Sequence, residues 1–93
     1  MSLHLDLWAK PNAGVALRKV FRETFYPAIS AQPGFTKCVL LHTEPETDLY
    51  RLIIKFENED LRKKWVATDL HQSVWPQLEA QCARYDAKFF EAV

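Results

Sequence analysis

Leucines alternate with polar or aromatic residues at the start of the chain. They occupy every second position of the segment 3–8, and the positions between them hold His4, Asp6 and Trp8. A period of two is typical of a strand with one buried face. We therefore expect a half-buried strand here, with its leucines toward the core.

A helical period follows. Apolar residues recur every three or four positions from Val15 to Ile29, and charged residues lie between them. Asn12 is placed to cap this helix. Pro27 has no backbone N–H, so the helix should kink or restart there. Pro33-Gly34 should end it.

Segments 35–43 and 49–56 are rich in residues that favour strands, and the polar segment 44–48 lies between them. Two strands joined by a short polar loop predict a hairpin. In the second strand, one phase holds Tyr50, Leu52, Ile54 and Phe56. This phase is expected to face the core.

The chain then returns to helical spacing. Asn58 is placed to cap a helix in which Leu61 and Trp65 lie one turn apart. Asp69 with Gln72 three residues later matches a capping box, which predicts that a new helical segment starts there. The buried stripe of that segment is predicted to be Leu70, Val74 and Leu78. Segment 82–90 alternates again, with Tyr85, Ala87 and Phe89 in its inward phase.

The resulting order is β-α-β-β-α-β, in a single domain that covers residues 1–93. This order predicts an α+β, ferredoxin-like sandwich: an antiparallel four-stranded sheet with its helices on one face. The first strand should lie between the third and the fourth.

The opposite face of the sheet has no predicted cover. Its residues are of mixed charge, with a large indole at the edge: His4, Asp6, Trp8, Arg51, Ile53, Lys55, Arg84, Asp86 and Lys88. A bare sheet face in so small a protein favours a symmetric homodimer whose two sheets face each other. His4 and Asp6 are two apart on this face, which suits either an acid/base pair or an interface salt bridge with Arg51 or Arg84.

Composition excludes several classes of function. Twelve basic and twelve acidic residues cancel, whereas a nucleic-acid binder needs a basic surplus. No apolar stretch is long enough to span a bilayer, and the N-terminus lacks a signal-peptide pattern. Two isolated cysteines, Cys38 and Cys82, suggest free thiols in a reducing cytoplasm.

Motifs for phosphate or metal binding are absent as well. The chain has two glycines, Gly14 and Gly34, too few for the glycine-rich phosphate loops or the nucleophile elbow. The histidines His4, His42 and His71 show no metal-ligand spacing. We therefore expect no cofactor, no metal, no nucleic acid and no membrane as partners, and a pocket as the place for any chemistry.

Three segments resemble the antibiotic biosynthesis monooxygenase domain of the dimeric α+β barrel group. They are Pro33-Gly34-Phe35, the strand at 49–56 and the run from Trp65 to His71. The resemblance covers nearly the whole chain. It implies a homodimer and an activity among cofactor-free oxygenases of aromatic polyketides, quinol oxygenases and haem-degrading enzymes, or a protein without an assigned reaction.

The haem-degrading branch of that family gives a direct test. It uses an asparagine on the first strand, a tryptophan on the second helix and a histidine ten residues after the tryptophan. Here Trp65 matches, but Leu7 and Trp75 stand at the other two positions. The haem ligand is missing from this pattern, so haem degradation is disfavoured.

The resemblance places Trp65 in a pocket between sheet and helices, where it would stack on a flat substrate; filling the core is the alternative. His71 is the candidate proton acceptor or donor, although it is also an ordinary polar helix residue. The further substrate-binding candidates are Trp75, Tyr50, Phe21 and Phe25. Tyr50 and Tyr85 are candidate hydroxyl donors into the pocket. The run Arg62-Lys63-Lys64 is expected to be a solvated face.

These observations favour a cofactor-independent monooxygenase of a small aromatic or quinol-type molecule. A non-enzymatic ligand-binding or dimerisation module on the same fold is the alternative. An RNA-recognition domain shares the order of elements but needs exposed aromatics on the third strand. Arg51, Ile53 and Lys55 occupy that phase, so this function is set aside.

Overall fold

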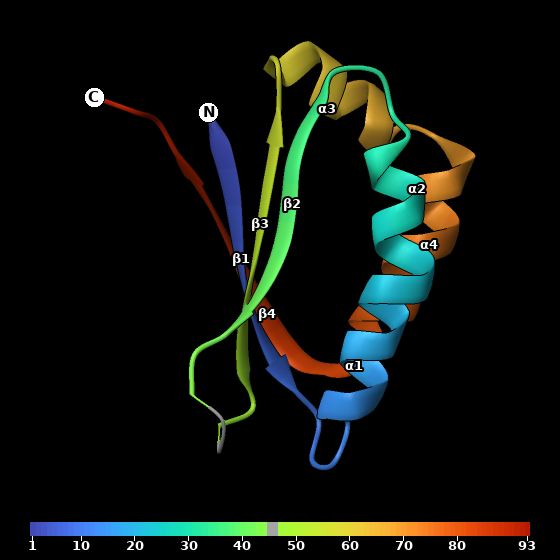
Figure 1. Ribbon diagram of the computed structural model, residues 1–93, viewed down its shortest axis with the longest axis vertical. Helices are drawn as coiled ribbons and strands as arrows, with labels where there is room; N and C mark the ends of the chain where they lie inside the picture. The colour runs from blue at the N-terminus through green and yellow to red at the C-terminus, as the bar shows by residue number, and fades with distance from the viewer. Residues whose placement is uncertain (45–46) are drawn as a thin grey trace.

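A computed structural model describes residues 1–44 and 47–93 of the chain. It has two layers, a sheet and a set of helices that covers one face of it (Figure 1). The strands are β1 (Ser2–Ala9), β2 (Phe35–His42), β3 (Leu49–Phe56) and β4 (Cys82–Phe90). The polar turn predicted at 44–48 includes residues 45 and 46, which lie outside the described residues.

The strand order is β2-β3-β1-β4, with antiparallel pairing throughout. Leu5 pairs with Leu52 of β3 on one side and with Ala87 of β4 on the other. Partners directly opposite each other share a face of the sheet. The predicted ferredoxin-like topology and the central position of the first strand are therefore confirmed.

The first helical layer changes type along its length. It runs through α1 (Gly14–Val20), a π-helical turn η1 (Phe21–Phe25) and α2 (Tyr26–Ser30). Pro27 cannot donate to the carbonyl four residues earlier, and the π-helical turn lies directly before this gap in the hydrogen-bond ladder. The expected kink or restart at Pro27 thus takes the form of a change of helix type: α2 begins at Tyr26, and the backbone stays helical through Phe25 and Tyr26.

The predicted cap at Asn12 is wrong. Asn12 has a φ of 63°, in the left-handed region, and α1 begins after Ala13 without a side-chain cap. Asparagine tolerates this conformation better than most residues. Asn12 therefore forms the tight turn that leads from β1 into α1.

The second helical region begins as predicted, at Asn58. Its side-chain oxygen accepts a hydrogen bond from the N–H of Leu61 at 3.0 Å, at the start of α3 (Glu59–Val66). The next helix, α4 (Asp69–Glu79), is capped by Thr68, one residue before the predicted Asp69. Gln72 does not close a capping box, because its side-chain amide donates to the carbonyl of Val66 at 3.0 Å.

The core lies between the inner face of the sheet and the helices. Its largest fully buried side chains are Phe25, Leu7, Leu17, Ile29, Leu52 and Leu78. On α4, Val74 and Leu78 are buried as predicted, but Leu70 is 44% exposed. Eight residues of helix turn about 80° beyond two full turns, which carries Leu70 out of the stripe that Leu78 occupies.

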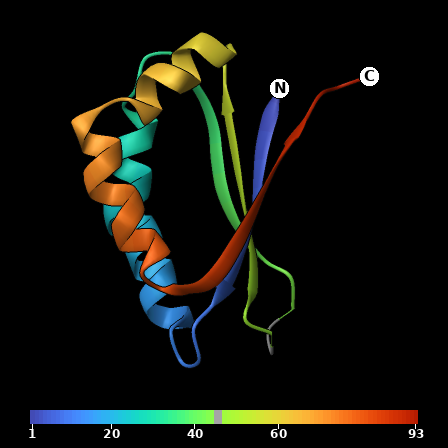
Figure 2. The ribbon, with the colours of Figure 1, turned by 180° about the vertical axis from the view of Figure 1, so that it is seen from behind.

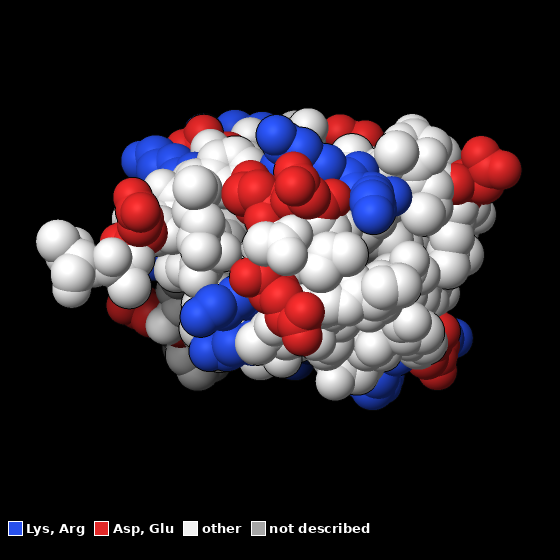
Figure 3. Space-filling model, turned by 90° about the horizontal axis from the view of Figure 1, so that it is seen from above, with Lys and Arg blue, Asp and Glu red and all other residues white. Residues whose placement is uncertain are grey.

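The opposite face of the sheet carries no secondary-structure element, as the view from behind shows (Figure 2). Seen from the end where the termini lie, basic and acidic side chains are interspersed (Figure 3). No helix in the described part of the chain is long and apolar enough to cross a membrane.

Candidate functional site

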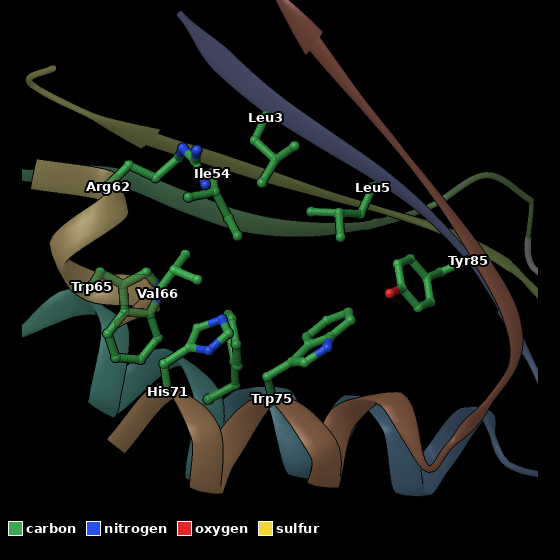
Figure 4. A pocket seen from close by; sticks show the side chains of 10 residues that line it. Leu3, Leu5, Ile54, Arg62, Trp65, Val66, His71, Trp75 and Tyr85 are labelled. Atoms are coloured by element: carbon green, nitrogen blue, oxygen red, sulfur yellow. The ribbon is translucent and has the colours of Figure 1, made fainter. Parts of the chain in front are cut away.

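A cavity of about 170 Å³ lies between the sheet and the helices (Figure 4). Tyr85 of β4, which is 44% exposed, forms part of its wall. Its lining is mostly apolar and aromatic: Leu3, Leu5, Phe25, Ile54, Arg62, Trp65, Val66, His71, Trp75 and Tyr85.

Aromatic rings form most of the wall on the helix side. Phe25 meets Trp65 and Trp75 edge to face, with ring centroids 6.2 and 6.3 Å apart. Trp75 meets Tyr85 of β4 in the same way at 5.2 Å. Edge-to-face packing fixes the orientation of each ring, so these residues present rigid apolar surfaces to a ligand.

His71 projects from the first turn of α4 into the cavity (Figure 4). Its ring lies edge to face with Trp65, with centroids 5.1 Å apart. Partial burial lowers its pKa below the ordinary value of 6.5, because the charged imidazolium loses solvation. The imidazole is therefore neutral at neutral pH.

Two neighbours hold His71 in place. The Thr68 hydroxyl accepts from the His71 backbone N–H at 3.1 Å and donates to the Trp65 carbonyl at 2.7 Å. The Gln72 amide nitrogen lies 3.4 Å from Nδ1 of His71. Such a long contact biases the imidazole tautomer only weakly. It leaves Nε2 as the ring nitrogen that is free to face the cavity.

Arg62 lines the cavity, which corrects its predicted place on a solvated face. It lies three residues before Trp65 on α3, and this spacing puts both side chains on one side of the helix. Its side chain is only 16% exposed and forms an ion pair with Glu59 at 3.0 Å. Lys63 and Lys64 are exposed, as expected.

The structure brings four of the predicted site residues together at this cavity: Phe25, Trp65, His71 and Trp75. Phe21 does not line it and instead packs against Phe25 and Tyr26, at 6.5 and 5.9 Å. Tyr85 does line it, which its inward phase on the last strand made predictable.

Tyr50 also lies outside the cavity. Its hydroxyl accepts a hydrogen bond from Nε of Arg18 at 3.1 Å, and its ring stacks on His42 at 4.2 Å. A Cβ at Gly14 would lie 2.9 Å from this hydroxyl. The missing side chain at Gly14 therefore allows α1 to approach Tyr50, and Tyr50 joins the helix to the sheet at the end away from His71.

The predicted outer-face residues share one face of the sheet, by the pairing of the strands. Arg51 donates to Asp6 at 2.9 Å, and this hydrogen bond holds the pKa of Asp6 below its usual value. The guanidinium of Arg84 lies 3.7 Å from the ring centroid of Trp8. Asp6 thus pairs with Arg51 and not with His4, and Lys55, Asp86 and Lys88 are exposed.

Cys38 and Cys82 are free and buried, as expected. Burial raises the pKa of the Cys38 thiol to about 12 and, with the nearby charge of Glu79, that of Cys82 to about 11. Both thiols are therefore poor nucleophiles. In the two described ranges, no group of three or more His, Cys, Asp or Glu side chains is arranged to hold a metal ion.

No family model and no curated protein matches the sequence. Solved structures do match. A variant of SnoaB, a cofactor-independent oxygenase from Streptomyces nogalater, superimposes with a TM-score of 0.85 at 21% identity, over 98% of this chain and 90% of that one.

Two further solved structures agree. A candidate antibiotic biosynthesis monooxygenase from Caulobacter crescentus gives a TM-score of 0.84 at 18% identity, over 99% of this chain and 88% of that one. Another antibiotic biosynthesis monooxygenase gives 0.82 at 15% identity, over 99% and 97% of the two chains. The chain therefore has the fold of the antibiotic biosynthesis monooxygenases, as its resemblance implied.

Proposed function

We propose that this protein is a cofactor-independent monooxygenase that acts on a small aromatic or quinol-type molecule in the cavity beside β4. The observation that carries the proposal is the position of His71. It is a neutral, partly buried imidazole within a wall of aromatic rings. The similarity in fold to a cofactor-independent oxygenase supports it.

Trp65 and Trp75 would position the substrate. Both line the cavity, although Trp65 is only 2% exposed and also fills the core, and Phe25 supports both by edge contacts. A flat electron-rich ring stacks favourably on such surfaces and displaces water from them. The binding step thus needs shape and desolvation more than hydrogen bonds.

His71 would accept the proton of the substrate hydroxyl at Nε2. Desolvation favours the neutral imidazole, so the acceptor is available at neutral pH without prior deprotonation. The apolar lining then shields the phenolate from water, which keeps it reactive.

The proposed reaction balances with dioxygen as its only co-reactant. The phenolate gives its electrons to dioxygen, and a bond forms between a ring carbon and one oxygen atom. His71 returns a proton to the resulting peroxide. Loss of the hydrogen on that carbon and cleavage of the O–O bond then yield a quinone and water. The substrate supplies every electron, so this route requires no flavin or metal.

The test is oxygen uptake by the purified protein with a panel of hydroquinols and hydroxyanthrones, without added metal or flavin. We expect uptake above the rate without enzyme, and a strong decrease in the Trp65→Ala and His71→Asn variants. Tyr26→Ala controls for loss of an aromatic ring outside the cavity. Because Trp65 is buried and Tyr26 is exposed, urea unfolding must also show that Trp65→Ala is folded at the assay temperature.

Two results would contradict the proposal. One is the absence of uptake across the panel by folded wild-type protein, which would favour the non-enzymatic binding module. The other is equal loss of activity in the Tyr26→Ala control, which would show that the effect of Trp65→Ala does not report on the cavity.

We also propose that a second copy of the chain covers the outer face of the sheet. Leu41 and Phe90 are about half exposed there, and Val39 and Ile53 lie between them. Nδ1 of His4 on this face is buried without a hydrogen-bond partner among the described residues. Light scattering should show a dimer, and Ile53→Glu should give a folded monomer. A monomeric wild type would refute this arrangement.

A further inference from the structure

We infer that Arg62 selects the substrate by charge, and that the cavity takes a single-ring aromatic that carries a carboxylate or a comparable anionic group. The inference rests on the proposed function for the location of the site. It adds a class of substrate and a specificity-determining residue.

The first observation is the charge of the cavity wall. Among the described residues that line the cavity, Arg62 is the only one with a charged side chain, and none carries a carboxylate. The other lining residues are apolar, aromatic or, in the case of His71, neutral at neutral pH. A ligand with one negative group therefore finds one cation in the wall, and the carboxylate paired with that cation, Glu59, does not line the cavity.

The second observation is that Arg62 is held in place through Nε while its other hydrogen-bond donors have no partner among the described residues. Glu59 accepts only from Nε, at 3.0 and 3.2 Å to its two oxygens. The guanidinium lies 4.9 Å from the ring centroid of Phe89. Its two terminal nitrogens have no hydrogen-bond partner in the part of the chain that the structure describes. They form the edge of the fork that binds a carboxylate in a bidentate manner.

A purely structural role would not require this placement. An ion pair between residues three apart on a helix forms equally well on the solvated side and contributes little to stability there. Here the guanidinium instead lies over the cavity, next to Leu3 and Ile54 (Figure 4). Because Glu59 and Phe89 already order the side chain, a ligand loses little entropy in using it.

The third observation is size. A cavity of roughly 150 Å³ accommodates one benzene molecule in a protein core, and this cavity measures about 170 Å³. It therefore encloses one ring with a small substituent, while the rings of a fused tricyclic compound would project through the opening. A single-ring acid matches both the volume and the charge.

The experiment measures binding without turnover, so that its outcome is independent of the oxygenase activity. Tryptophan fluorescence is titrated under anaerobic conditions with a dihydroxybenzoate and, separately, with the corresponding uncharged carboxamide. We expect the wild type to bind the acid about tenfold more tightly than the amide, as suits a charge-assisted hydrogen bond.

Arg62→Gln should abolish this preference, and measurable binding of the amide by this variant shows that it is folded. Lys63→Gln removes the same charge from the next residue of α3, an exposed one, and should keep the preference. Equal affinity of the wild type for acid and amide, or a preference that survives Arg62→Gln, would overturn the inference.

These titrations, together with the oxygen-uptake assay of the proposed function, separate the two proposals. Selective binding of the acid together with no oxygen uptake would confirm the role of Arg62 and refute the oxygenase. Oxygen uptake with neutral quinols and no selectivity for the acid would do the reverse.

Discussion

The two faces of the sheet come from the same strands but depend on different interactions. On β1, Leu5 and Leu7 are 6% and 0% exposed on the inner face, whereas Asp6 between them and Trp8 after them stay partly accessible. The inner face is stabilised by burial under the helices. On the outer face, side chains of neighbouring strands contact each other, as in the ion pair between Asp6 and Arg51. Alternation along one strand thus separates the residues that stabilise the fold by burial from the residues that pair with neighbouring strands at the surface.

The helices do not cover the inner face evenly. The core covers β1 and β3 well, but on β4 the inward residues Tyr85 and Phe89 remain 44% and 49% exposed. The cavity borders this thinly covered strand, where Tyr85 meets Trp75. The proposed site therefore lies at the edge of the hydrophobic layer, between buried residues such as Trp65 and the exposed residues of β4.

The largest expected effect compares a leucine from each face. Leu7→Ala should lower the free energy of unfolding by about 2–5 kcal/mol, because Leu7 is fully buried and the substitution leaves a cavity. Leu41→Ala, on the outer face and 49% exposed in the single chain, should cost about 0.5 kcal/mol or less at protein concentrations low enough to keep the chain monomeric. Urea titrations at one fixed protein concentration measure both, because association would change apparent stability. Equal costs would mean that the outer face is as buried in solution as the core.

Alternation was enough to predict most of the architecture. It identified the inward leucines of the first strand and the outward Arg51 and Lys55 correctly, since burial of one sheet face leaves few other arrangements. The order of elements then predicted the topology.

The site was less predictable. Whether Trp65 fills the core or lines a cavity depends on how α3 and α4 pack, which no local pattern states. Arg62 was assigned to solvent because it stands in a basic run, although its spacing from Trp65 pointed inward. The cap of the last helix was predicted at Asp69 but lies one residue earlier, at Thr68, because both residue types are good helix caps.

The next effect concerns the titrating group of the inner face. Burial lowers the pKa of His71 below 6.5, so the active neutral form persists at neutral pH. As the pH falls below the lowered pKa, kcat/KM should decline by about tenfold per pH unit. The same burial makes the folded state less stable at acid pH, because the unfolded chain binds this proton more readily.

The measurement is oxygen uptake from pH 5 to 8, within the range in which histidine titrates. His71→Asn should remove the acid limb of the profile along with most of the activity. An unchanged acid limb in the residual activity of that variant would assign the proton transfer to another group.

A smaller effect is expected at the start of α4, the helix that carries His71 over the inner face. Thr68→Ala removes the hydroxyl that accepts from His71 and donates to Trp65, and should cost about 1 kcal/mol of stability. Asp69→Ala should cost roughly 0.3 kcal/mol, through the helix dipole alone. Urea unfolding of both variants in the same buffer gives the comparison. A greater cost for Asp69→Ala would restore Asp69 as the cap.

The smallest effect is expected on the outer face, where Asp6 and Arg51 form an accessible ion pair. Asp6→Asn keeps the size of the side chain and removes its charge, and solvent and salt screen such pairs strongly. Stability of the monomer at neutral pH should therefore hardly change. The pKa of Asp6 is lowered by Arg51, so the small contribution of the pair is present above the unfolded pKa of 3.8 and is lost as the pH falls through the folded value. Urea midpoints of wild type and variant should accordingly converge in acid. A large loss at neutral pH that depends on protein concentration would mean that a second copy buries the pair, and that the outer face is held by an interface as the inner face is held by its helices.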